Sequence, residues 1–201
     1  MKITIFLFIV LFSSCFLNQK PILIIPETRK DEIFAKFVNP ITDKYELPKL
    51  REISLSGDDL EVRVWFSEFE IDGFILKRTD RIWTAIAIKE INCKQVGYYY
   101  PKDKIYRMGK ISLFTPKSGW ENTWQNLVDA GILGLHYSYY ISMIDETGYM
   151  METNVNGTYR IRFYGSEEKS QEAEQMRKIG EIIANEFGLH NFKIGSLCLE
   201  K

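Results

Sequence analysis

The spacing of apolar and polar positions changes along the chain from a strand pattern to a helix pattern, and it predicts an α+β fold. Leu60–Phe66 alternates apolar and charged residues, as a half-buried strand does. Two more β-rich segments, Phe74–Lys77 and Ile82–Ile91, are separated from it and from each other by the turn signals Ile71–Gly73 and Thr79-Asp80. These segments together predict an antiparallel β meander.

A second group of strands is predicted in the C-terminal half of the chain. Lys110–Phe114 has strand character, and Tyr137–Ile144 is expected to pair with Gly148–Val155 around an intervening turn. Asn156-Gly157 then joins this last strand to Thr158–Tyr164. We expect a tight hairpin there, because both residues tolerate the positive φ angles of a type I′ turn.

Two amphipathic helices are expected to pack on this antiparallel sheet. The first follows Ser118–Glu121, which has the spacing of a capping box. Its apolar face contains Trp120, Trp124, Leu127 and Val128. The second covers Ser166–Phe187, with its first serine as the N-cap and Gly188 as the stop. A shorter helix is expected over Thr28–Val38, ending at Asn39-Pro40.

Composition and charge exclude several classes of function. The chain has 201 residues, of which 45% are hydrophobic and 26% charged, and its formal net charge is −1. This composition is that of a globular protein, and a basic footprint for nucleic acid is absent. The two histidines have no nearby cysteine or histidine partners in the sequence, and the glycines are scattered singly. The sequence therefore predicts no metal site, no phosphate loop and no cofactor.

The first residues have the proportions of a secretory signal. Lys2 precedes the ten-residue segment Ile3–Phe12, which is apolar except at Thr4, and two small residues, Ser13 and Ser14, follow it. About twenty apolar residues are needed to cross a bilayer, so this segment is short for a transmembrane helix. A core strand is the alternative interpretation of the same segment.

Leu11-Phe12-Ser13-Ser14-Cys15 resembles a bacterial lipobox, with phenylalanine where leucine is usual. The resemblance implies that the Cys15 thiol carries a diacyl lipid and that cleavage occurs just before it. Residues 1–14 would then be a signal peptide, 15–28 a tether and 29–201 a single α+β domain, located in the cell envelope outside the cytoplasm. Ordinary cleavage near Cys15 and an uncleaved anchor remain open. Two or more acyl chains hold a protein firmly on a membrane.

The other two cysteines, Cys93 and Cys198, leave two alternatives open. Lipidation of Cys15 makes them an even pair in an oxidising compartment, where a disulfide could join the C-terminal segment to the central region. Alternatively, each is a separate buried thiol that behaves as a small apolar side chain.

Candidate chemistry is sparse. A hydrolase could draw on His136 and Asp145, although no Gly-x-Ser-x-Gly elbow accompanies them. Asp72 and Asp145 both stand in turn sequences, where aspartate commonly bonds its own turn backbone. Three consecutive tyrosines, Tyr98, Tyr99 and Tyr100, cannot all face inward, and they are candidates for a surface that contacts a ligand, a glycan or a partner.

Beyond the lipobox, the order of signals resembles uncharacterised bacterial lipoproteins of the Bacteroidota kind. The resemblance rests on Glu61–Trp65, the Trp120 helix, Asp145 with its following strand, Tyr159–Arg162 and the last helix. It implies no known activity. We expect a membrane-tethered, non-enzymatic domain that contacts another protein or an envelope component. The alternatives are a small-ligand or glycan-binding module that uses the tyrosines, and a hydrolase centred on His136.

Overall fold

The computed structural model describes residues 29–66, 71–92, 106–113, 115–136, 148–165 and 167–191, and it confirms the α+β fold. The described strands form one antiparallel sheet in the order β4-β3-β2-β1-β5-β6. The strands are β1 (Leu60–Trp65), β2 (Gly73–Thr79), β3 (Ile82–Asn92), β4 (Tyr106–Ser112), β5 (Gly148–Val155) and β6 (Thr158–Gly165). The helices are α1 (Arg29–Lys44), α2 (Trp120–Asp129) and α3 (Gln171–Phe187), with short 3-10 turns at Leu50–Glu52 and Leu189–Asn191.

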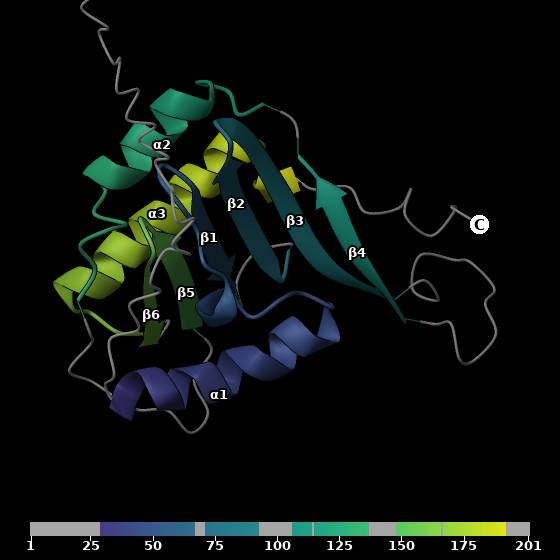
Figure 1. Cartoon of the computed structure of the whole chain (residues 1–201), viewed down its shortest axis with the longest axis vertical. Helices are drawn as coiled ribbons and strands as arrows, with labels where there is room; N and C mark the ends of the chain where they lie inside the picture. Colours follow the sequence, from purple (N-terminus) through teal and green to yellow (C-terminus); the bar gives the residue numbers. More distant parts are fainter. Residues whose placement is uncertain are drawn as a thin grey trace, which may run out of the picture.

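The sheet is covered on both faces (Figure 1). Helices α2 and α3 pack on one face, against an apolar layer that includes Val62, Val64 and Leu76. Helix α1 and the segment after it cover part of the other face, around Trp65 and Ile75. The two amphipathic helices expected from the sequence are therefore confirmed as a layer on one side of the sheet.

The meander continues as expected through β1, β2 and β3, but strand β5 has one neighbour, β1, that the sequence did not predict. Its two edges are taken by β1, where Glu152 lies opposite Arg63, and by β6. Tyr137–Ile144, which was predicted to pair with β5, lies outside the described residues, and both edges of β5 are taken by described strands. The predicted hairpin between β5 and β6 is confirmed, with Asn156 and Gly157 at φ angles of 51° and 70°.

Helix α1 does not stop at Asn39-Pro40, as the sequence predicted, but continues to Lys44. A proline inside a helix removes one backbone hydrogen bond. Here the flanking side chains of Val38 and Thr42 are buried against the sheet, and the Thr42 hydroxyl donates to the Asn39 carbonyl at 2.9 Å. Packing on both sides of the proline thus offsets its local cost.

The predicted helix caps are also corrected. Helix α2 begins after Gly119, at φ 83° and without a side-chain cap. The expected capping box of Ser118 and Glu121 is absent, because Glu121 instead accepts a hydrogen bond from the Trp83 indole at 2.7 Å. Helix α3 begins at Gln171, and its N-cap is Ser170 rather than Ser166, which lies outside the described residues. Gly188, at φ 68°, ends α3 as predicted.

Candidate functional site

Most of the side chains singled out in the sequence lie outside the described residues. These are Cys15, Cys93, Cys198 and the three tyrosines Tyr98, Tyr99 and Tyr100. The lipid attachment, the disulfide and the tyrosine surface therefore all stay predictions.

His136 is described, and its environment is simple. Its side chain is exposed, and its backbone carbonyl accepts a hydrogen bond from the Tyr164 hydroxyl. Among the described residues, nothing is bonded to the imidazole. Asp145, the carboxylate considered with it, lies outside the described residues. No serine or carboxylate in the described part of the chain is bonded to His136, so the hydrolase hypothesis stays a prediction.

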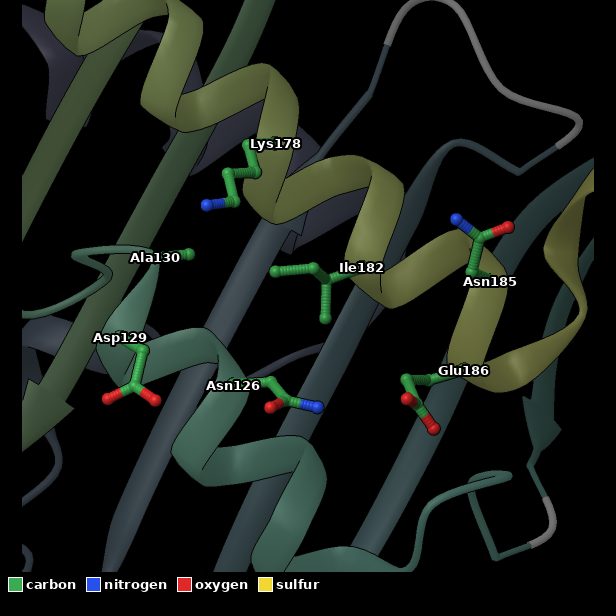
Figure 2. Close-up of a pocket in the computed structure, with 7 residues that line it drawn as sticks. All are labelled: Asn126, Asp129, Ala130, Lys178, Ile182, Asn185 and Glu186. Carbon is green, nitrogen blue, oxygen red and sulfur yellow. The ribbon is translucent and has the colours of Figure 1, made fainter.

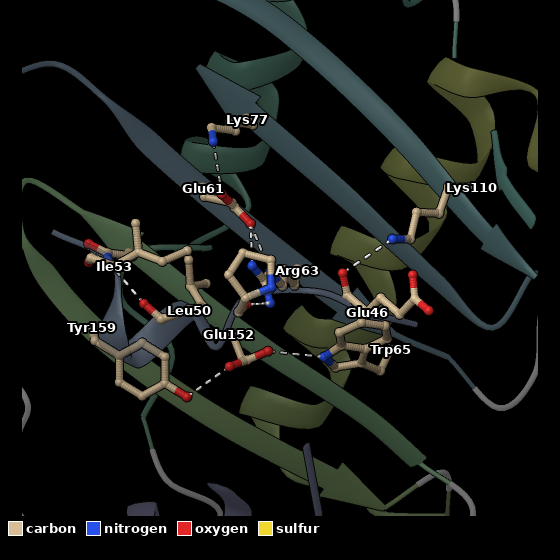
Figure 3. Close-up of polar contacts among 12 residues, drawn as sticks. Glu46, Leu50, Ile53, Glu61, Arg63, Trp65, Lys77, Lys110, Glu152 and Tyr159 are labelled. Carbon is tan, nitrogen blue, oxygen red and sulfur yellow. Dashed lines mark hydrogen bonds and ion pairs between the residues drawn. The ribbon is translucent and has the colours of Figure 1, made fainter. Parts of the chain in front are cut away.

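A cluster of charged side chains lies buried on the sheet face that α1 covers (Figure 3). Arg63 is 1% exposed, and two of its guanidinium nitrogens lie 2.8 and 2.7 Å from one oxygen of Glu61, which is 4% exposed. Lys77 approaches the other Glu61 oxygen at 3.6 Å. The alternation in β1 predicted a half-buried strand, and this is wrong, because all six residues of β1 are buried.

Glu152 completes this cluster from strand β5. Its two carboxylate oxygens accept hydrogen bonds from the Trp65 indole at 3.2 Å and from the Tyr159 hydroxyl at 2.9 Å. Burial raises the pKa of Glu152, and the positive charge of Arg63 and the two hydrogen bonds oppose that shift only in part. The cluster therefore holds one buried carboxyl group that resists ionisation.

The segment from Pro48 to Ile53 covers the cluster and is held in place through its backbone carbonyls. Arg63 donates to the Pro48 carbonyl at 2.8 Å, and Asn154 donates to the carbonyls of Leu50 and Ile53 at 3.3 and 2.8 Å. These bonds fix the segment over the buried charges. Because water and substrate have little access to them, the cluster fits a role in holding the fold better than a role in catalysis.

Asp72 lies at the end of the same sheet face and bonds to distant parts of the chain. One carboxylate oxygen accepts from the Tyr45 hydroxyl and from the Glu90 amide, each at 2.6 Å. The other oxygen lies 3.2 Å from the Lys89 ammonium group. The Asp72 carboxylate thus joins Tyr45, which directly follows α1, to strand β3. The sequence predicted only a bond within the local turn.

The tip between β2 and β3 is unusually constrained. Asp80 and Arg81 both have positive φ, at 51° and 67°, although neither is glycine. The Asp80 amide donates to the Asp59 carboxylate at 2.9 Å, and Arg78 donates twice to the Asp58 carbonyl, at 2.9 and 2.6 Å. The next residue, Ile82, is 68% exposed. Asp58 and Asp59, in the loop before β1, therefore fix the conformation of the β2–β3 turn, and the Ile82 side chain next to this turn is exposed to solvent.

Aromatic side chains continue from this tip onto helix α2. Trp83 and Trp120 have parallel rings with centroids 6.4 Å apart, and the Arg78 guanidinium lies 5.0 Å from the Trp83 ring centre. Trp120 and Trp124 are partly exposed. Trp83 is buried, and its side chain points to the opposite face of the sheet from that of Ile82. We call Arg78, Arg81 and Ile82 the tip surface.

A second surface feature is a groove of about 390 Å³ between α2 and α3 (Figure 2). Three residues of α2 and its C-cap face four residues of α3 across it. The lining residues are Asn126, Asp129, Ala130, Lys178, Ile182, Asn185 and Glu186. The side chains are mixed in charge and mostly polar, so the groove differs from the apolar core beneath it.

No helix among the described residues is both long and apolar enough to cross a membrane. No three of their His, Cys, Asp or Glu side chains are grouped to hold a metal ion. Comparison of the chain with protein-family models, with curated proteins and with solved structures finds no match.

Sequence reasoning missed the tip surface, the groove and the buried charges. The sequence did contain a signal for the tip. Thr79-Asp80 was identified as a turn, and the apolar residue Ile82 lies two positions after it. No local pattern could reveal the groove, because residues from two helices far apart in the sequence line it.

Proposed function

We propose that this chain is a lipid-tethered domain of the cell envelope that contacts another protein or envelope component through the tip surface. The locked exposure of Ile82 is the observation that carries the proposal. Single exposed apolar side chains are common on proteins. What distinguishes Ile82 is its place after two non-glycine residues in left-handed conformations, which cost free energy and cluster at functional positions.

The composition of the tip surface supports binding. Arginine is among the side chains most enriched in residues that dominate binding energy, and Arg78 and Arg81 flank the turn beside Ile82. The bonds from Arg78 to Asp58, and from Asp80 to Asp59, fix the surface before a partner arrives. A preformed surface loses less conformational entropy on binding.

The tether supports the location. The lipobox-like segment ending at Cys15 precedes α1 by about a dozen residues. Intact-mass measurement of the membrane-extracted chain, beside a Cys15→Ser variant, tests this part. We expect an acylated mass for the wild type alone, and an unacylated wild type would contradict the anchor.

Site-specific photo-crosslinking in the native envelope tests the contact. A photoreactive residue at Thr84, which is exposed on the strand that begins at Ile82, should give a discrete adduct. The adduct should weaken strongly when Ile82→Ser or Arg81→Ser is added. The matched control is the same probe at Glu181, which is exposed on α3. Equal adducts from both positions, or an adduct that Ile82→Ser leaves unchanged, would contradict the proposal.

A further inference from the structure

The groove between α2 and α3 is formed by two facing stripes of side chains. Asn126, Asp129 and Ala130 follow the i, i+3, i+4 spacing on α2 and its C-cap, and Lys178, Ile182, Asn185 and Glu186 follow i, i+4, i+7, i+8 on α3. Residues with these spacings lie on one side of a helix. Figure 2 shows Ile182 near the centre, with the polar groups around it.

Two bonds outside the groove orient its carboxylates. The Gln125 amide donates to one oxygen of Asp129 at 2.8 Å, and the Ser118 backbone amide donates to one oxygen of Glu186 at 2.8 Å. Each carboxylate therefore keeps its second oxygen for another donor. The side-chain amides of Asn126 and Asn185 and the Lys178 ammonium group make no hydrogen bond or ion pair to any other described residue, so their bonding capacity is also open.

The charges and apolar area of the groove exclude several ligand classes. Two carboxylates and one ammonium group give it a net charge of −1, so it disfavours phosphates and other anions. Ile182 and Ala130 are its only apolar side chains, which is too little apolar lining for a lipid or a large aromatic ligand. Its volume of about 390 Å³ lies at the lower end of the range for small-molecule sites, roughly 300–1,000 Å³.

We infer that this groove binds a neutral polyhydroxylated ligand of one to three sugar rings. A hydroxyl group both donates and accepts. Adjacent hydroxyls can therefore donate to the open oxygens of Asp129 and Glu186 and also accept from the amides of Asn126 and Asn185. The C–H face of a sugar ring would rest on Ile182. This site is separate from the tip surface and does not depend on the Cys15 lipid.

Residue-resolved NMR of the full chain in detergent micelles tests the inference with defined probes. Maltotriose and chitotriose are the neutral probes, glycylglycine is the zwitterionic probe and inorganic phosphate is the anionic one. We expect at least one trisaccharide to shift the amide signals of α2 and α3 around Asn126 and Asn185 in a saturable way. We expect glycylglycine and phosphate to leave these signals unchanged.

Matched variants connect the binding to the groove. Asn126→Ala and Asn185→Ala should each weaken trisaccharide binding about tenfold, the effect of one lost pair of good hydrogen bonds. Asn122→Ala removes an exposed amide of α2 that bonds the Ser118 carbonyl and does not line the groove, so binding should be unchanged. Thermal unfolding of each variant checks that the fold is intact. Binding of neither trisaccharide, equal binding by both groove variants and wild type, or tighter binding of glycylglycine or phosphate would each overturn the inference.

Discussion

Trp65 and Glu152 come from neighbouring strands in the middle of the sheet, and the Trp65 indole donates a 3.2 Å hydrogen bond to the buried carboxylate of Glu152. Tyr159 donates to the other carboxylate oxygen. Burial raises the pKa of the Glu152 carboxyl group, and two aromatic side chains, Trp65 and Tyr159, are hydrogen-bonded to it.

Glu152 should make the stability of the fold depend on pH. Its pKa is raised in the folded state above the unfolded value of about 4.3. Its contribution is therefore fully present below about pH 4 and is lost as the pH rises through the folded-state pKa. Glu152→Gln should flatten this part of the stability–pH curve, because an amide does not titrate. The amide can still accept from Trp65 and donate to Tyr159, so the variant keeps both contacts. Urea unfolding at a series of pH values measures it.

The control for that experiment is Glu174→Gln, which changes an exposed carboxylate in the first turn of α3. It should leave the shape of the curve unchanged. The assignment to Glu152 would be contradicted if Glu152→Gln kept the wild-type dependence on pH.

Arg63→Met should be strongly destabilising. It removes the buried ion-pair partner of Glu61 and the positive charge near Glu152, and it leaves the Pro48 carbonyl without its donor. Breaking a buried ion pair on one side costs about 3–5 kcal/mol. Arg51→Met, at a partly exposed position of the nearby 3-10 turn, should change the free energy of unfolding by less than about 0.5 kcal/mol. Denaturant unfolding compares them, and similar losses in both variants would contradict a special role for Arg63.

Gly73→Ala should disturb Trp65. A Cβ at Gly73 would lie 2.5 Å from an atom of the Trp65 ring, which has no free space to move into because it is buried. Overpacking of this kind costs about 1–3 kcal/mol. We expect a lower melting temperature and a changed tryptophan emission. In Gly134→Ala the nearest atom to the new Cβ would be 3.8 Å away, so neither quantity should change.

The helix caps give a direct test of structure against local pattern. Ser170→Ala removes the side chain that accepts from the Ala173 amide at 3.1 Å, and should cost about 1 kcal/mol. Ser118→Ala removes a hydroxyl that contacts the Thr123 hydroxyl and caps no amide, and should cost less. Thermal or denaturant unfolding of the two variants decides the order, and a larger loss for Ser118→Ala would restore the predicted capping box.

The periodicity of the sequence predicted the strands from 60 to 91, the hairpin at Asn156-Gly157 and the two helices that pack on the sheet. Each of these depends on residues within one or two turns of each other, so local pattern is sufficient. The partner of β5 could not be predicted in this way. Strands β1 and β5 are separated by about ninety residues, and Tyr137–Ile144 offered an equally good local pattern.

The candidate sites show the same division. The sequence by itself determined the class of fold, the weak net charge and the lipobox-like segment ending at Cys15, because these depend on composition and on neighbours in the chain. Only the tertiary structure decided that Glu61 and Arg63 are buried. The segment from Pro48 to Ile53 that covers them is bonded through its backbone carbonyls. Every residue has such a carbonyl, so no side-chain pattern in this segment could predict the contact. It likewise decided that α2 and α3 form a polar groove, because that surface exists only once two amphipathic helices lie side by side.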